Sequence, residues 1–174
     1  MRIPPRGSPD DWFAWLTSSS APLRKRATLI LGGLEPTDDV PVEPLVGRLR
    51  DGREDVVFWA LVGVARLGAR ARAALPDICR IAVAHEAFGV RQAAIGALVD
   101  IGPGEPNTIA TLRLALRDGS PYVRREALEA IIEVPQLTEA DLGAIAEMAR
   151  DEDETVADWS EIALRNIRLR RQRR

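Results

Sequence analysis

The chain has a single cysteine, Cys79, and a single histidine, His85, among its 174 residues. One cysteine excludes a disulfide bond within the chain and is typical of a reducing compartment. One imidazole beside one carboxylate, Glu86, supplies neither the converging ligands of a metal site nor the partners of a catalytic base. The sequence therefore predicts no metal site and no catalytic residue, with His85 in a solvated turn and Cys79 as a buried, inert thiol.

Long apolar runs and phosphate-binding loops are also missing. No stretch approaches the roughly 20 apolar residues of a membrane-spanning helix, and the opening MRIPPRGSPDDW contains no apolar leader core. Neither G-x-x-x-x-G-K-[ST] nor G-x-G-x-x-G occurs. We therefore expect a cytoplasmic protein that binds no nucleotide cofactor and makes no contact with a membrane.

The charges do not add up to a broad basic face. The chain has 24 basic and 26 acidic residues, a formal net charge of −2, with an acidic stretch over residues 101–160 and a basic end after it. Nucleic-acid binding, which depends on clustered cations, is therefore disfavoured for the whole chain. It stays open for the tail, which otherwise is a solvated end and contains Arg168, Arg170, Arg171, Arg173 and Arg174.

What the sequence does contain is one apolar pattern, repeated five times. Val90, Ala94, Ala97, Leu98 and Ile101 fall at offsets 0, 4, 7, 8 and 11, the spacing of one face of an α-helix. The pattern recurs every 33 or 34 residues, from the anchors Leu23, Val56, Val123 and Val156. Five copies predict an all-α fold, an αα-superhelix of about five helical hairpins.

The repeat also defines the domain and its ends. We expect a disordered N-terminus over residues 1–8 and a basic tail over 169–174. The single repeat domain, 9–168, divides into hairpins at 9–34, 41–68, 69–102, 106–134 and 138–168. Ser8 followed by Pro9 is typical of a helix start. Pro76 predicts that the residues before it form a separate short helical piece.

The second helix of the hairpins opens with a recognisable signature. Val90-Arg91 with Ala94, and Val123-Arg124 with Ala127, read V-R-x-x-A, and Leu23-Arg24 with Ala27 matches loosely. An aspartate precedes this helix in three of the five turns, at Asp51, Asp118 and Asp151. In these features the chain resembles the HEAT-repeat family in its short prokaryotic form. The resemblance implies a stacked solenoid with one continuous core and implies no particular activity.

Arg24, Arg91 and Arg124 occupy one repeated position. A ladder of arginines along a solenoid can bind a ligand such as phosphate, but the same position is within reach of the turn aspartates. Pairing inside the stack is the favoured interpretation because it needs no external partner.

Offsets 2, 6 and 9 from each anchor point away from the buried stripe, to what would be the concave wall. That wall is apolar in its N-terminal half and charged in its C-terminal half. The segment VVFWALVGVARLG is apolar nearly all round, which indicates either burial on every side or an exposed docking patch. We interpret the chain as a non-catalytic protein-interaction module whose partner-binding residues on this face are Leu29, Phe58, Val62, Arg91, Arg124 and Arg125.

Other functions stay open at this point. A HEAT-like family of DNA glycosylases uses arginine, tryptophan and a catalytic aspartate, so this resemblance draws attention to Trp59, Trp159 and Asp158. Packing of both tryptophans against the adjoining hairpin is the stronger interpretation, because both lie on a helix flank and Trp159 lies in an acidic segment. The lyase-type HEAT proteins suggest a third function, that of an accessory subunit of an enzyme. Self-association through the concave patch is a variant of the first.

Overall fold

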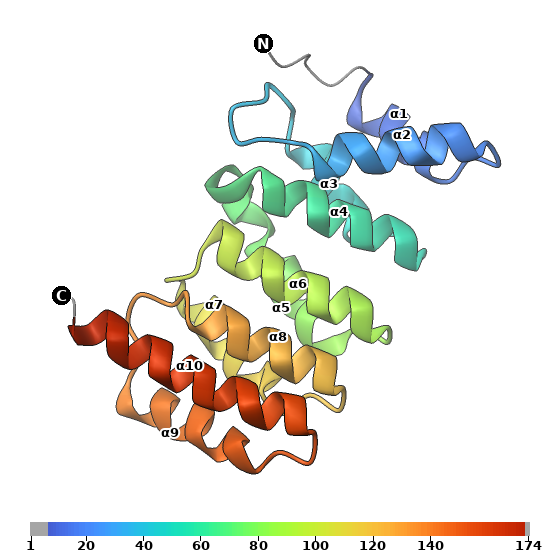
Figure 1. Ribbon diagram of the computed structural model, residues 1–174. Helices are drawn as coiled ribbons and strands as arrows, with labels where there is room; N and C mark the ends of the chain where they lie inside the picture. Colours follow the sequence, from blue (N-terminus) through green and yellow to red (C-terminus); the bar gives the residue numbers. More distant parts are fainter. Residues whose placement is uncertain (1–6, 173–174) are drawn as a thin grey trace.

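The computed structural model describes residues 7–172 and contains no strand in that range. Its elements, in order, are α1 (Pro9–Leu16), α2 (Ala21–Gly32), α3 (Glu43–Arg48), α4 (Glu54–Arg66), the 3-10 helix η1 (Gly68–Ala74), α5 (Leu75–Ala84), α6 (Phe88–Ile101), α7 (Pro106–Ala115), α8 (Pro121–Ile131), α9 (Glu139–Glu147), the 3-10 helix η2 (Met148–Arg150) and α10 (Glu154–Gln172). Within the described range the α-helices pair in sequence order into five hairpins. Figure 1 shows these hairpins stacked along one axis. The predicted all-α superhelix is confirmed. No helix within 7–172 has both the length and the apolar character needed to cross a membrane.

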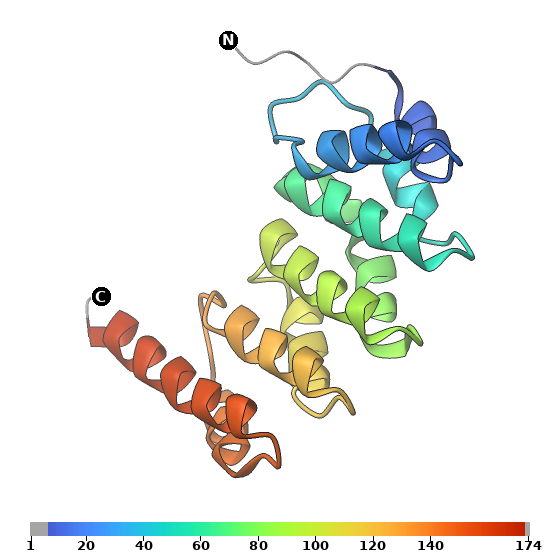
Figure 2. The same cartoon turned by 45° about the vertical axis from the view of Figure 1, so that its right-hand side comes forward.

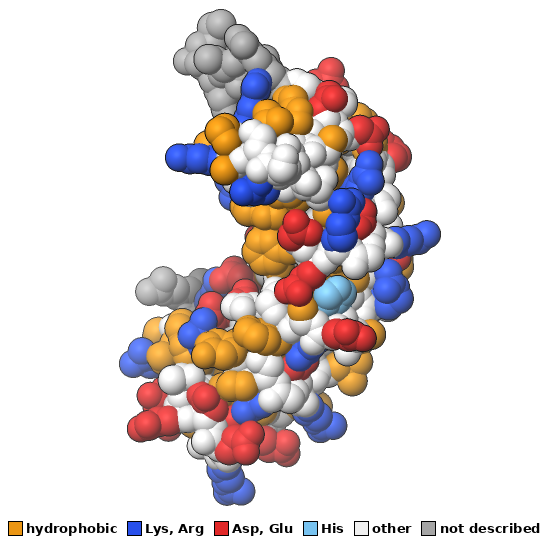
Figure 3. Space-filling view, turned by 90° about the vertical axis from the view of Figure 1, so that its right-hand side faces the viewer, with side chains coloured by type: hydrophobic (Ala, Val, Ile, Leu, Met, Phe, Trp, Pro, Cys, Tyr) orange, Lys and Arg blue, Asp and Glu red, His pale blue; other side chains and the backbone are white. Residues whose placement is uncertain are grey.

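The hairpins form two layers. The second helices, α2, α4, α6, α8 and α10, pack one against the next and make up what we call the inner layer. Figure 2 shows the same order from a second direction, with the first helices behind. In the space-filling view of Figure 3 the stack bends, and the side lined by the inner layer is hollowed.

The repeated apolar stripe forms the core between the layers. Val56, Val90, Val123 and Val156 each expose at most 1% of their surface. Most of the apolar residues at the other offsets are buried with them in one continuous cluster along the stack, and Ile30 and Leu164 are half-buried against it. Leu23, the anchor of the first hairpin, is half-buried because no earlier hairpin covers it. Equal spacing of apolar residues therefore produces stacking rather than collapse around one centre.

A capped helix closes the N-terminal end of this core. The Ser8 hydroxyl accepts a hydrogen bond from the Asp11 backbone N–H at 3.3 Å, and the Asp11 carboxylate accepts one from the Ser8 N–H at 2.8 Å. Pro9 occupies the first turn, as expected. Trp12 and Phe13, at 1% and 2% exposure, cover the core of the first hairpin. Ser8 is thus part of the domain, and residues 1–6, for which we expected disorder, lie outside the described residues.

The third hairpin begins with the predicted break. η1 ends at Ala74 and α5 starts at Leu75, with Pro76 in its first turn. Gly68 starts η1 at φ = +57°, in the left-handed region that favours glycine. The expectation for Cys79 was wrong in its burial: Ile78, at 0% exposure, takes the core position, and Cys79 is half-buried with its Sγ 3.7 Å from the Asn107 carbonyl oxygen.

The last helix continues past the expected boundary at residue 168. α10 runs to Gln172, and Arg170 donates to the Ile132 carbonyl and forms an ion pair with Glu133 at 2.8 Å. Arg171 donates to the Leu137 carbonyl at 2.8 Å and pairs with Glu139 at 2.9 Å. This part of the tail therefore packs on the loop between α8 and α9, while Arg173 and Arg174 lie outside the described residues.

Candidate functional site

All five turns between the paired helices are built in the same way. One side chain in each accepts a hydrogen bond from the backbone N–H two residues later, at 2.8 to 3.2 Å. The acceptors are Ser18, Asp51, His85, Asp118 and Asp151. In the third turn His85 thus uses its Nδ1 where Asp118 and Asp151 use a carboxylate oxygen. The imidazole has a structural role, which the sequence analysis did not predict.

Two of these turns are joined to the preceding hairpin by an arginine, which is buried in one case, Arg124, and partly buried in the other, Arg91. Arg91 donates from Nε and Nη2 to the Asp118 carboxylate, both at 2.8 Å, and Arg124 binds Asp151 in the same way at 2.8 and 2.7 Å. Their Nη1 atoms donate to backbone carbonyls of the turn before. Burial raises the pKa of Asp118, but the hydrogen bonds from Arg91 and the Ser120 N–H outweigh it and hold that pKa below its usual value.

Arg91 and Arg124 are therefore not free to contact a partner. The Arg124 side chain is 8% exposed and that of Arg91 15%. Pairing inside the stack, which the sequence analysis favoured for this position, is what the structure contains. Arg24 makes a different contact: its Nη1 donates to the carbonyls of Ser18 and Ser19, at 2.7 and 2.8 Å.

The inner layer carries an open groove between α4 and α6. Phe58, Val62 and Ala65 form its α4 wall, and Gln92 and Gly96 form its α6 wall. The groove has a volume of about 400 Å³ and is lined mostly by apolar atoms. The apolar side chains at the hollow of Figure 3 lie on this side of the molecule. We call this feature the α4–α6 groove.

Helix α4 is apolar nearly all round because it has two different apolar faces. Val57, Leu61 and Val64 are buried in the core, whereas Phe58 and Val62 are half-buried and line the groove. The sequence left open whether this helix is buried on every side or has an exposed apolar patch. In the structure one apolar face of α4 is buried in the core and the other faces the open groove.

The groove is shaped by a small residue and a polar contact. A side chain at Gly96 would point towards Glu126 of α8, with its Cβ 3.6 Å from Oε1. The Gln92 amide donates to the other oxygen of Glu126 at 2.9 Å. Glu126 also lines the groove, so three consecutive inner helices contribute to it.

The remaining candidates lie apart from the groove. Leu29 is 66% exposed on α2, and Arg125 forms an ion pair with Glu129 at 3.4 Å within α8. Neither lines the groove. Trp59 packs edge-on against Phe58, with ring centroids 5.6 Å apart, and faces Gly32 of the preceding hairpin. Trp159 is half-buried beside Glu129 of α8 and Ile132, the residue that follows this helix. Both tryptophans therefore pack at boundaries between hairpins, and Asp158 is exposed.

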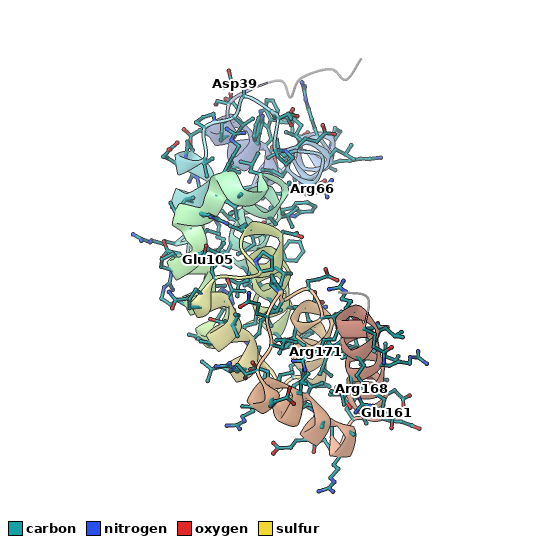
Figure 4. All side chains as sticks on the ribbon, turned by 90° about the vertical axis from the view of Figure 1, so that its left-hand side faces the viewer. Asp39, Arg66, Glu105, Glu161, Arg168 and Arg171 are labelled. Carbon is teal, nitrogen blue, oxygen red and sulfur yellow. The ribbon has the colours of Figure 1, made fainter. Side chains whose placement is uncertain are left out.

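Carboxylates accompany the groove on its α6 and α8 side. Asp100 and Glu126 line it together with one cation, Arg66. Figure 4 shows Arg66 at the end of α4, on the open side of the stack. Burial raises the pKa of Asp100, and Arg66 partly offsets that effect. Burial, followed by repulsion from Glu126, also raises the pKa of Glu129, with Arg125 acting in the opposite direction.

The structure adds an exposed aromatic pair that the sequence analysis missed. Phe88 and Tyr122 stack with ring centroids 5.4 Å apart and an interplanar angle of 22°. They are 48% and 55% exposed. Phe88 lies two residues before its anchor and Tyr122 one residue before its own. Adjacent hairpins bring the residues just before their anchors close together. Two aromatic residues at these positions in successive repeats are therefore the sequence signal that could have indicated the pair.

No cluster of three or more metal-ligating side chains occurs in the part of the chain that the structure describes. The α4–α6 groove itself is an apolar recess with carboxylates at one side.

Solved structures of repeat proteins resemble this stack. The complex of CpcE and CpcF of phycocyanin lyase from Nostoc sp. PCC7120 contains a chain that is 19% identical, with a TM-score of 0.71 over 89% of this chain and 96% of that one. A designed armadillo repeat protein in complex with the peptide (KR)4 is 19% identical, with a TM-score of 0.62 over 90% of this chain and 80% of that one. At these identities the likeness shows the fold alone. A search of curated proteins finds no match.

The family model described as HEAT repeats matches the sequence twice, over residues 43–132 and 75–165. The two matches together cover more than half of the chain and include the hairpins that carry the V-R-x-x-A signature and the groove. The chain therefore belongs to the HEAT-repeat family.

Proposed function

We propose that the protein is a non-catalytic binding module that holds a segment of a partner protein in the α4–α6 groove. The observation that carries this proposal is the second apolar face of α4. Phe58 and Val62 remain accessible in a recess of about 400 Å³, although the core has been completed without them. A concave, apolar recess of this size is typical of a binding site, and burial of large apolar side chains supplies most of the free energy at such sites.

The solved neighbours support binding by this architecture. The designed armadillo repeat protein is in complex with a peptide, and the phycocyanin lyase chain is in a complex of two proteins, CpcE and CpcF. An accessory role beside an enzyme is compatible with the same groove, since it too requires a docked protein. Partner binding by Leu29 and Arg125 stays a prediction, and Arg91 and Arg124 are left out because their guanidinium groups already bind Asp118 and Asp151.

Nucleic-acid binding is the weaker alternative. Arg170 and Arg171 of the basic tail are engaged with Glu133, Glu139 and nearby carbonyls. The groove itself is lined by Asp100 and Glu126, which repel phosphate. Salt-sensitive binding of duplex DNA, weakened by trimming the tail, would favour this alternative.

The test blocks the groove without touching the core. Gly96→Leu places a side chain in the recess, where its Cβ meets only the Glu126 Oε1 at an ordinary contact distance. Helix α6 should tolerate the change, because leucine favours helices more than glycine does. Partners captured by the wild-type protein are identified by mass spectrometry, purified and titrated against both forms. We expect Gly96→Leu to fold normally by circular dichroism and to lose the partner.

Gly143→Leu is the matched control, since Gly143 lies on α9 and a Cβ added there would point into open space. Phe58→Ala provides a second way of weakening the groove, by removing its largest apolar contact. The proposal fails when Gly96→Leu and Phe58→Ala keep every partner of the wild type, or when Gly143→Leu loses the same partners.

A further inference from the structure

We infer that the groove recognises a cationic segment, a stretch of a partner protein in which arginine or lysine alternates with apolar residues. In this arrangement an apolar side chain enters the α4–α6 groove, while cations contact Asp100 and Glu126 and lie on the Phe88–Tyr122 rings. This inference rests on the proposed function and adds the chemistry of the partner.

The first support is that neither groove carboxylate forms an ion pair with a described residue, although Arg66 attracts Asp100 at longer range. Neighbouring acidic residues are paired: Glu129 of α8 pairs with Arg125, and Glu133, in the loop after α8, pairs with Arg170. Within residues 7–172, by contrast, Glu126 accepts only the Gln92 amide, and neither Glu126 nor Asp100 forms an ion pair. A cation brought by a partner could therefore form an ion pair with either carboxylate without displacing one that is already present.

The second support is the partial burial of Glu126, which is half-buried beside Gly96. Asp100, at the end of α6, is exposed by comparison, although desolvation by the surrounding protein still raises its pKa. A desolvated carboxylate is less stable in its charged form and gains more from a nearby cation than a carboxylate in water does. Arg66 is the single cation among the groove-lining residues, against two acids.

The third support is the aromatic pair at the end of the groove. Phe88 precedes Gln92 by four residues, so it lies one turn further along the same face of α6, next to Gly89, which lines the groove. A Cβ at Gly89 would have open space around it, so the surface beside Phe88 is accessible at this point. Two half-exposed, stacked rings offer the face on which a guanidinium or ammonium group binds best.

Arginine and lysine suit all three features at once. Their aliphatic stems cover apolar surface while the charged heads reach polar groups or aromatic faces. An acidic segment, or a nucleic acid, would bring negative charge towards Asp100, Glu126 and the nearby Glu129. The charge on the groove therefore selects against such ligands as well as for basic ones.

The probes are three synthetic peptides of equal length in which leucine alternates with arginine, glutamine or glutamate. Fluorescence anisotropy measures the affinity of each peptide for the full chain. We expect the leucine–arginine peptide to bind about tenfold more tightly than the leucine–glutamine peptide, and to weaken as salt is added. The leucine–glutamate peptide should bind least.

Two double variants test the contacts. Asp100→Asn with Glu126→Gln should reduce the affinity for the leucine–arginine peptide about tenfold and leave the leucine–glutamine peptide unchanged. Its matched control is Asp39→Asn with Glu43→Gln, which makes the same change in net charge away from the groove; Asp39 lies in a loop at the far end of the stack (Figure 4). Phe88→Ala with Tyr122→Ala should also weaken the arginine peptide, whereas Leu114→Ala, a 60% exposed leucine on α7, should not.

The outcomes separate this inference from the proposed function. If all three peptides bind with equal affinity and Gly96→Leu loses binding of each, the inference of a cationic partner is overturned. The groove then remains a binding site without this charge preference. A loss of affinity that is the same in the Asp39/Glu43 control also overturns it, because the effect would then come from net charge. Absence of binding by all three peptides overturns it as well, and the proposed function is then decided by the purified native partner.

Discussion

The boundaries between hairpins differ at the two ends of the stack. The third and fourth hairpins, and the fourth and fifth, are joined by the buried pairs Arg91–Asp118 and Arg124–Asp151. In the second hairpin the corresponding position holds Val57, which is 2% exposed and packs in the core. The helices stack in the same order at both ends (Figure 1). Apolar spacing is thus sufficient for stacking, and the arginine ladder is an addition to it.

Ion pairs at the N-terminal boundaries lie on the outer surface instead. Arg48 pairs with Asp10, and Arg50 with Asp77, each at 2.9 Å, but the Arg50 side chain is 71% exposed. Exposed pairs contribute little to the free energy of unfolding, whereas a buried pair becomes costly when one partner is removed. The two ends of the stack should therefore respond differently to the same type of substitution.

Arg124→Ala should give the largest effect. The change leaves the Asp151 carboxylate, 8% exposed, without its two charged hydrogen bonds, and leaves the Asp118 carbonyl without a donor. We expect the free energy of unfolding to fall by about 2 to 4 kcal/mol. Urea titration followed by circular dichroism measures this value.

Arg24→Ala is the matched substitution at the other end. Arg24 is exposed and contacts only two turn carbonyls, so we expect a loss of at most about 1 kcal/mol. Similar losses of unfolding free energy in Arg24→Ala and Arg124→Ala would contradict the distinction between the C-terminal boundaries, which contain arginine–aspartate pairs, and the N-terminal boundaries, which are apolar.

Gly63→Ala examines the apolar boundary directly. Gly63 takes the position that alanine holds in the next three hairpins, and an added Cβ would lie 2.8 Å from Leu45 Cδ2 and 3.3 Å from Leu31 Cδ2. Because these side chains are fully buried, overpacking should cost about 1 to 3 kcal/mol.

Gly96→Ala is the comparison on α6, where the added methyl group meets only Glu126 at 3.6 Å. Here the better helix propensity of alanine should leave the free energy of unfolding unchanged or raise it by up to about 1 kcal/mol. Thermal melts of the two variants would contradict the steric argument if Gly63→Ala were the more stable protein.

The stacking could be predicted from the sequence because it depends on spacing alone. The anchors from Val56 to Val156 are buried as the offsets require, and the arginine–aspartate pairing followed from the repetition of both residues at the same positions of the hairpins. Within one helix, periodicity places a residue on a face to within part of a turn. That resolution was insufficient for Cys79, whose neighbour Ile78 takes the core position.

The candidate site could be predicted only in part, because it depends on distances between helices. Phe58 and Val62 were assigned to the concave face from their offsets, and both line the groove. Whether a helix that is apolar on both sides has one side open depends on how far its neighbours stand apart. The Phe88–Tyr122 stack depends on the same separation, and so did not follow from the pattern within either helix.

Asp141 provides a last comparison between the two ends, and its expected effect depends on pH. It lies at the C-terminal end of the stack, is 1% exposed, and accepts hydrogen bonds from Arg113 at 3.0 Å and from the Thr138 N–H at 2.8 Å. The hydrogen bond from Arg113, together with those from Thr138, outweighs burial and lowers the pKa of Asp141 to about 2. Asp77, its N-terminal counterpart on the outer surface, is likewise held below its usual pKa, first by Arg50.

A lowered pKa in the folded state means that the charged form of Asp141 stabilises the fold above about pH 4, and that this contribution is lost as the pH falls towards 2. Because the Arg113 side chain is 48% exposed, solvent screening limits the contribution to about 1 to 2 kcal/mol. Urea titrations at neutral pH and between pH 4 and 2 should show that Asp141→Asn loses this amount at neutral pH and then falls less steeply on acidification than the wild type. Asp77→Asn should change less, since Arg50 is the more exposed partner, and an equal change in both variants would mean that burial of the carboxylate does not distinguish the two ends.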